Sequence, residues 1–507
     1  MLKLGLAQQR QGRHDQALGS FEELIERFAE SPHRIQARFE RGQALVALDR
    51  LDEARQAFEQ VLREGGESRF GVYAHNHLGA IAMRQKRYAE AADRFARVAQ
   101  GCPDEATAAE ALCQRGQALL LVEQYAAAEK AFRQLLEQYA SHERALQAQA
   151  QLAVACARQD RFADALELIR RVERGGFDKL DKTLRAGVRY EKAWCLRELG
   201  KADEAANVYR ELLEAPGAKF DFHAALELAE LEAAAKCYEQ AVQLLQRLSS
   251  EADSASPRVS SEILEKAAYR LGVCEFELGR TKAAAETLER FVKTFPDSPL
   301  FASASFFCGE AYFRDGRQER AVTHFARVVE RYASDAVYGP SLLRLGESLA
   351  ALQRWARSEK AFTDYLERQA DSEQWFQAQF GIGWARENQG RHDEAIEAYR
   401  AVVARHKGPT AARAQFQIGE CLFARKQYED AARELLKVDI LYAYPEWSAA
   451  ALYEAGRCFE ALGKTVEART QFKAVVEKHK QTRWGELAGK RLAALSASVL
   501  PGRSSKP

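Results

Sequence analysis

Cysteine and histidine are the residues of this chain best suited to bind a metal ion or to act as nucleophiles. The 507 residues include nine Cys and ten His. The number of Cys is odd and no Cys-x-x-Cys pair occurs, so the pattern favours neither a disulfide framework nor a zinc site. Cys195, Cys274, Cys421 and Cys458 instead recur at one point of a repeating pattern, where a small, weakly polar side chain packs well. Core packing is therefore the prediction for the Cys residues, with a disulfide between neighbouring helices as the alternative.

The histidines do not form a group with metal-ligand spacing. His75 and His77 are two residues apart, which on a helix directs them about 200° from each other. His14 and His392 stand where corresponding segments of the chain have Tyr. The sequence has no His-Glu-x-x-His motif, no Walker loop and no nucleophile–base–acid set. It therefore predicts a protein that is not an enzyme and that needs no metal or other cofactor.

A repeat of about 37 residues accounts for the placement of these side chains. Each unit has a Gly or Ala, here named the small position, then an Ala 12 residues later and a large apolar residue four after that. The small positions are Gly5, Gly42, Gly79, Gly116, Ala153, Ala193, Ala229, Gly272, Gly309, Gly346, Gly383, Gly419 and Gly456. The second position is Ala in every unit but one, which has Ser358. The spacing is helical, and a Gly or polar residue seven after the small position marks a turn. Each unit is thus predicted to be two antiparallel helices, A and B.

The repeat resembles the tetratricopeptide repeat family. The segments LGAIAMRQKRYAEAADRF (78–95) and GIGWARENQGRHDEAIEAY (381–399) match its order of small residue, turn, aromatic, Ala and aromatic. The resemblance implies an all-α solenoid, a right-handed superhelix of about thirteen helix pairs. The longer unit and links such as FPDSP (295–299) are similar to repeats of bacterial cell-envelope proteins, including the outer-membrane assembly lipoprotein and the Tol-Pal-associated periplasmic protein.

One large irregularity divides the predicted solenoid. The largest departure from the period lies in a Ser-rich and acidic stretch at 249–262, which we interpret as an exposed loop. The predicted order is an N-terminal array (1–248), this insertion, a C-terminal array (263–480), a capping helix (481–499) and a disordered tail (500–507). Met1 falls within helix A of the first unit, which predicts that the natural chain begins upstream.

Composition limits the choice of partner and compartment. The formal net charge is +1, so neither a nucleic-acid surface nor a polybasic membrane anchor is expected. No run of 18 apolar residues is present, so no transmembrane helix is expected. As it stands the chain reads as cytoplasmic, and a signal upstream of Met1 would make it periplasmic or associated with the outer membrane. The oligomeric state is left open.

Aromatic residues on helix A supply the candidate binding site. In the family, helix A lines the concave surface, which implies that the positions three before, one after and four after the small position face a partner. In the second half of the chain these positions are strongly aromatic: Tyr269, Phe276, Phe306, Phe313, Phe380, Trp384, Phe416, Phe423 and Tyr453. Packing against the neighbouring unit is the alternative, chiefly for the first of the three positions.

The predicted function is a non-catalytic scaffold that binds peptide or protein segments along the concave face. Two alternatives are a bacterial envelope assembly factor, periplasmic or lipid-anchored, and a regulatory arm of a larger enzyme. A chaperone clamp for C-terminal carboxylates is not expected, because no unit has Asn one residue after the small position.

Overall fold

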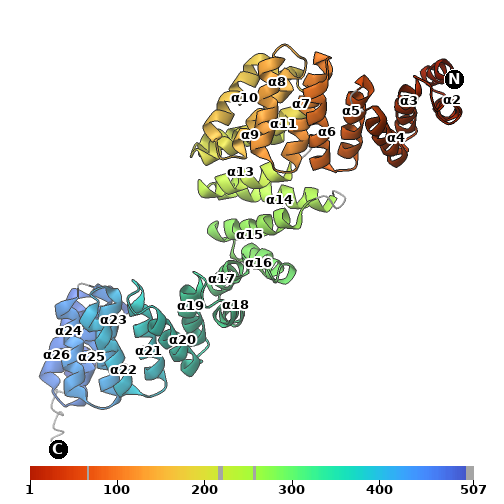
Figure 1. Cartoon of the computed structure of the whole chain (residues 1–507). Helices are drawn as coiled ribbons and strands as arrows, with labels where there is room; N and C mark the ends of the chain where they lie inside the picture. The colour runs from red at the N-terminus through yellow and green to blue at the C-terminus, as the bar shows by residue number, and fades with distance from the viewer. Residues whose placement is uncertain (66–67, 215–220, 255–258, 443, 498–507) are drawn as a thin grey trace, which may run out of the picture. The chain divides into compact units, whose positions relative to one another are not determined.

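The computed structural model is entirely helical over the residues that it describes, which are 1–65, 68–214, 221–254, 259–442 and 444–497 (Figure 1). These ranges hold helices α1 to α27 and one short 3-10 turn at Phe177–Lys179, and they contain no strand. The all-α repeat architecture predicted from the sequence is confirmed. The predicted tail at 500–507 lies outside the described residues.

The odd-numbered helices up to α25 contain the small positions and are the A helices. They are α1 (Leu2–Arg10), α3 (Arg34–Ala47), α5 (Arg69–Arg84), α7 (Glu105–Leu121), α9 (Ala145–Ala157), α11 (Lys182–Glu198), α13 (Phe222–Ala234), α15 (Ser261–Glu277), α17 (Phe301–Arg314), α19 (Tyr338–Ala351), α21 (Trp375–Asn388), α23 (Pro409–Ala424) and α25 (Pro445–Ala461). None of the described helices is both long enough and apolar enough to span a lipid bilayer.

The even-numbered helices are the B helices and carry the Ala and the large apolar residue. They are α2 (His14–Arg27), α4 (Leu51–Gly65), α6 (Tyr88–Gly101), α8 (Tyr125–Gln138), α10 (Phe162–Gly176), α12 (Ala202–Glu214), α14 (Tyr238–Ser254), α16 (Thr281–Thr294), α18 (Gln318–Arg331), α20 (Trp355–Arg368), α22 (His392–Arg405), α24 (Tyr428–Leu441) and α26 (Thr465–Lys478). The last helix, α27 (Arg483–Ala497), packs against α26.

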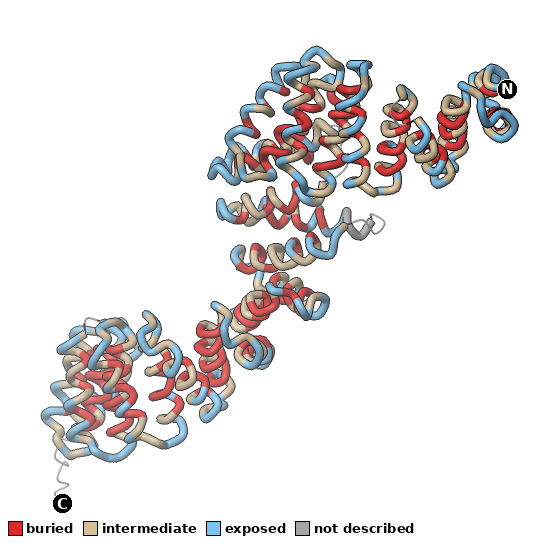
Figure 2. The backbone as a smooth tube through the Cα atoms, viewed as in Figure 1, coloured by how far each residue is buried: buried red, intermediate tan, exposed pale blue. Residues whose placement is uncertain are grey.

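The helix pairs pack as two larger bodies, which we call the first unit (Met1–Leu231) and the second unit (Glu232–Pro507) to distinguish them from the repeat units. Within each unit buried residues follow the contacts between helices (Figure 2). The predicted insertion at 249–262 lies in the second unit: its first six residues belong to α14, its last two to α15, and 255–258 fall outside the described residues. Helices α14 and α15 pack against each other and share a core of Ala241, Val242 and Cys274.

A glycine at the small position makes room for the large apolar side chain of its own B helix. A Cβ atom built on Gly116 would lie 2.4 Å from ring carbons of Phe132, closer than any side chain tolerates. Phe132 is fully buried, so its ring fills the space that the glycine leaves open. The same interlock, Gly with Phe, Tyr or Leu, recurs in every unit that has Gly at the small position. It explains why the two positions repeat together.

The turn between helices A and B needs a left-handed residue. In all thirteen units the residue seven after the small position has a positive φ, whether it is Gly, as at Gly12 and Gly316, or not, as at Asp49 and Glu123. A residue of this conformation ends a helix by turning its backbone away from the helical path. The predicted turns are therefore confirmed.

Side chains that depart from the repeat still serve packing. Ser358, the one exception at the Ala position, is buried and donates a 2.8 Å hydrogen bond to the carbonyl oxygen of Gly346 on the partner helix. Seven of the nine Cys are buried, as core packing predicts, and Cys102 and Cys237 are half-buried. A Ser hydroxyl or a Cys thiol is thus accommodated in the packed core between helices.

Candidate functional site

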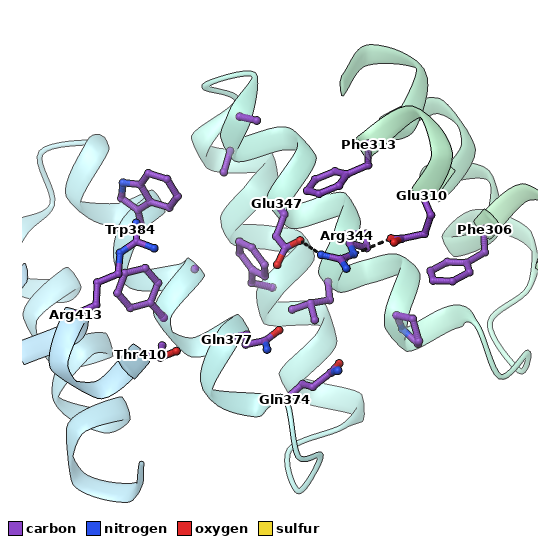
Figure 3. Close-up of a pocket in the computed structure, with 17 residues that line it drawn as sticks. Phe306, Glu310, Phe313, Arg344, Glu347, Gln374, Gln377, Trp384, Thr410 and Arg413 are labelled. Atoms are coloured by element: carbon purple, nitrogen blue, oxygen red, sulfur yellow. Dashed lines mark hydrogen bonds and ion pairs between the residues drawn. The ribbon is translucent and has the colours of Figure 1, made fainter. Parts of the chain in front are cut away.

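A groove of about 810 Å³ lies on the A helices of the second unit (Figure 3). Its walls come from four successive A helices, α17, α19, α21 and α23, with one ring from helix α20 and Gln374 just before α21. The lining is Phe306, Glu310, Phe313, Pro340, Leu343, Arg344, Glu347, Ala350, Ala351, Phe362, Gln374, Gln377, Phe380, Gly381, Trp384, Thr410 and Arg413. Aromatic and aliphatic side chains thus alternate with a few charged ones.

Four of the nine aromatic residues predicted from the sequence line this groove. They are Phe306, Phe313, Phe380 and Trp384. Trp384 is 37% exposed, and its ring lies 6.1 Å from that of Trp355. Phe380 is only 7% exposed, because one face of its ring contacts Tyr399 with 5.2 Å between centroids. A ring at the first position therefore serves both the core and the groove.

The other five predicted residues, Tyr269, Phe276, Phe416, Phe423 and Tyr453, lie outside the groove. Each packs on a neighbouring ring, at centroid distances of 5.1–6.0 Å. Phe276, Phe416 and Tyr453 are at most 8% exposed. These three side chains are buried against neighbouring rings, which is the arrangement that the packing alternative expects.

The sequence reasoning missed the part of the groove one and two turns before the predicted positions. Pro340, Gln377 and Arg413 stand six residues before the small position of their units, and Gln374 and Thr410 stand nine before. Steps of three and four residues keep side chains on one face of a helix. Continuing the predicted stripe toward the start of helix A could therefore have found these residues.

Two arginines in the groove differ in their partners. Arg344 bridges Glu310 and Glu347 at 2.7 Å each, and its guanidinium lies 5.1 Å from the Phe313 ring centre. Burial raises the pKa of Glu310, and Arg344 opposes that rise. Arg413 has no ion pair or hydrogen bond with any described residue; its guanidinium carbon lies 4.6 Å from the Phe380 ring centre and 5.1 Å from that of Trp384. Figure 3 shows both arrangements.

A Cys–His pair lies elsewhere in the second unit and has the residue types of an activated nucleophile. Cys308 Sγ lies 3.5 Å from His324 Nε2, and both residues are buried. Burial raises the pKa of Cys308 above its ordinary value and lowers the pKa of His324 to about 4. Both groups are therefore neutral near pH 7, the reverse of the thiolate–imidazolium state that a nucleophilic cysteine needs.

Replacing the buried carboxyl of Glu420 by an amide is expected to stabilise the protein at alkaline pH. Burial, with help from the neighbouring carboxylate of Glu454, raises the pKa of Glu420 to about 7. Among the residues that the structure describes, its Oε1 atom has no hydrogen-bond partner. Because the folded pKa exceeds the unfolded one, the stability this group contributes is present below pH 4.5 and is lost as the pH rises through 7. At pH 8 we expect the free energy of unfolding of Glu420→Gln to exceed that of the wild type by roughly 1–2 kcal/mol, after discounting for solvent screening.

The test is urea unfolding of both proteins at pH 4.5 and pH 8. The advantage of Glu420→Gln should be absent at pH 4.5, and the exposed Glu373→Gln serves as the control. An equal advantage at both pH values would contradict the assignment of the effect to ionisation.

Family models settle what this arrangement of helices is. The tetratricopeptide repeat model matches residues 2–69, 42–106, 113–178, 190–257, 269–336, 343–405 and 380–445, and a second tetratricopeptide repeat model matches 450–482. The chain belongs to the tetratricopeptide repeat family. Tetratricopeptide repeats typically bind other proteins, and the fold is generally a non-catalytic interaction scaffold. The cell-envelope subgroup stays a prediction.

Solved structures similar to this tetratricopeptide repeat protein share little sequence with it. MamA of AMB-1 is 22% identical over 37% of this chain and 92% of its own, with a TM-score of 0.31. A tetratricopeptide repeat protein from Parabacteroides merdae is 14% identical over 54% of this chain and 98% of its own, with a TM-score of 0.36. A chain of the APC/C hetero-tetramer Cut9–Hcn1 is 12% identical over 96% of this chain and 95% of its own, with a TM-score of 0.32. None of the curated protein sequences matches the chain.

Proposed function

We propose that this tetratricopeptide repeat protein is a non-catalytic scaffold that binds a segment of another protein in the groove of its second unit. The observation that carries the proposal is the continuity of the groove over four successive A helices, with an aromatic or aliphatic side chain from each of the first three. A surface of this kind suits a chain laid across the helices, because each helix offers a separate apolar contact.

The length of the groove supports a peptide rather than a small molecule. The groove crosses three spacings between successive A helices, and at about 10 Å each these give it a length of roughly 30 Å. An extended chain covers that distance with about nine residues, at about 3.3 Å per residue. A compact ligand would leave most of the lining uncovered.

The exposed rings at the groove are the expected hot spots. Phe313 is half-buried and Trp384 is 37% exposed, so both offer apolar surface that is not yet used for packing. Large aromatic side chains commonly supply most of the free energy at a protein interface. We therefore expect these two rings to contribute more to binding than the buried ring of Phe380.

The groove can be tested with peptides selected from a random twelve-residue phage library on the full chain. For selected peptides, Phe313→Ala/Trp384→Ala should weaken binding at least 30-fold in calorimetry, because loss of a hot spot costs about 2 kcal/mol or more. The control is Ile440→Ala/Val466→Ala, which removes apolar side chains 76% and 75% exposed on B helices outside the groove. Equal binding by the wild type and the groove variant, with the fold intact by circular dichroism, would rule the proposal out.

A further inference from the structure

Arg413 is a cation in the groove that has no counter-ion among the residues described by the structure. It is half-buried on α23, and burial lowers the pKa of its guanidinium, which nevertheless stays charged at neutral pH. Its nearest neighbours are the faces of aromatic rings, at 4.6 Å for Phe380, 5.1 Å for Trp384 and 6.0 Å for Trp447. These contacts orient the guanidinium but leave its five N–H donors without an acceptor among the described residues.

The carboxylate whose charge acts on Arg413 is occupied by other groups. Glu387 influences the charge on Arg413, but it accepts a 2.6 Å hydrogen bond from the Tyr399 hydroxyl and two from the Gln417 amide at 2.9 and 3.0 Å. Neutral donors therefore satisfy Glu387, and the arginine is left free. A charge that is partly removed from water and unpaired is costly, and a carboxylate brought by a ligand would relieve that cost.

Two other arginines on the A helices of this unit contrast with Arg413. Arg344 holds two carboxylates, and Arg457 pairs with Glu454 at 2.6 Å while lying over Phe423. In both cases the guanidinium lies over an aromatic ring and forms an ion pair with a carboxylate. Arg413 has the rings and lacks the carboxylate.

Further hydrogen-bonding groups stand at the Arg413 end of the groove. The amides of Gln374 and Gln377 and the hydroxyl of Thr410 line it, and none of them has a side-chain hydrogen bond to a described residue. Figure 3 shows Arg413 beside Trp384 and on the same side as Thr410. At the other end Glu310, Arg344 and Glu347 satisfy one another. The groove thus has an unpaired cation at one end and charges that neutralise one another at the other.

We infer that the segment bound here is acidic: the side-chain carboxylate of an Asp or Glu pairs with Arg413, and an aliphatic or aromatic residue of the same segment packs on Phe313 and Leu343. The inference rests on the proposed function and names the chemistry of the partner. Two helix spacings of about 10 Å separate α19 from α23, so the two residues stand about six positions apart in an extended segment. A single guanidinium fork suits one side-chain carboxylate.

The test is a selection from a synthetic random twelve-residue peptide library whose C-termini are carboxamides, carried out on wild type, Arg413→Gln and Arg413→Lys. Wild type should enrich Asp or Glu about six positions from an apolar residue, and Arg413→Gln should lose the acidic preference. The affinity of wild-type-selected peptides should fall about 10- to 100-fold in Arg413→Gln. Arg413→Lys keeps the positive charge but lacks the two parallel N–H donors of a guanidinium, so its affinity should lie between those of the wild type and Arg413→Gln. The exposed Arg331→Gln is the matched control and should bind as wild type does.

The outcomes separate the two proposals. Peptides that depend on Phe313 and Trp384, but show no acidic enrichment and bind Arg413→Gln equally well, overturn the inference and leave the proposed function standing. Peptides that bind irrespective of Phe313 and Trp384 overturn both. Acidic peptides that bind only with a free C-terminal carboxylate, in a parallel selection, overturn the assignment to a side chain.

Discussion

Adding one methyl group at Gly116 is expected to destabilise helices α7 and α8 by about 2–3 kcal/mol. The Cβ of Gly116→Ala would lie 2.4 Å from two carbons of the Phe132 ring, which is fully buried and cannot swing away. Forcing extra volume into a packed core costs about 1–3 kcal/mol or more. The better helix propensity of Ala returns about 1 kcal/mol of that cost. Because a 2.4 Å approach to an immobile ring is far inside contact distance, we place the gross cost at about 3–4 kcal/mol, which leaves a net loss of about 2–3 kcal/mol.

Hydrogen exchange of the α7 and α8 amides measures this effect, because it reports the free energy of local opening. The exchange rates of these amides should rise roughly 30- to 150-fold. The matched control is Gly187→Ala on α11, where a Cβ would meet nothing within 4 Å. That variant should be unchanged or more stable by up to about 1 kcal/mol. Similar losses at both sites would contradict the steric explanation.

The chain itself suggests a compensating change. None of the three units with Ala at the small position has Phe at the partner position: Ala153, Ala193 and Ala229 go with Ile169, Tyr209 and Leu245. The variant Gly116→Ala/Phe132→Ile copies the first of these pairs. It should lose less stability than the sum of the two single variants, by about 1 kcal/mol or more. Additive losses would mean that the two positions are not coupled.

Acid is expected to remove about 3 kcal/mol of stability from the second unit through His324. Burial, with the positive charge of Arg327 adding to it, lowers the pKa of His324 from 6.5 to about 4. Its imidazole contacts Cys308, stacks on the Tyr312 ring and is only 5% exposed, so water has little access to a charge there. Between pH 6.5 and 4 the unfolded chain therefore binds a proton that the folded protein does not, and stability falls as the pH falls. The difference in pKa sets the magnitude.

Urea unfolding followed by tryptophan fluorescence tests this, since five of the six Trp lie in the second unit. His324→Leu gives α18 the residue that stands at the same position of α10, Leu168. The free energy of unfolding of this variant, taken relative to that of the wild type, should increase by about 3 kcal/mol when the pH is lowered from 7.5 to 4. His392→Tyr, which gives α22 the first residue of α6, α8 and α24, is the control and should follow the wild type. Parallel curves for all three proteins would exclude His324 as the acid-sensitive group.

Local features of the fold were accessible from the sequence because they depend on contacts within one unit. The pairing of Gly116 with Phe132 and the turn at Glu123 belong to a single helix pair, so their spacing recurs with the period. The burial of most Cys follows for the same reason, because their position on helix A is fixed relative to the small residue.

The sequence by itself determined which face of the A helices carries aromatic residues, since helical periodicity sets the direction of each side chain. Only the tertiary structure decided which of those residues meet. Phe276 and Phe313 hold the same position in successive units, yet the Phe276 ring is covered by Arg314 and Phe307, whereas Phe313 lines the groove. Arg344 likewise receives the carboxylate of Glu310 from a neighbouring helix pair, whereas Arg413 receives none among the described residues. The physical reason is that such contacts join helices from different units, and the period of one unit carries no information about them.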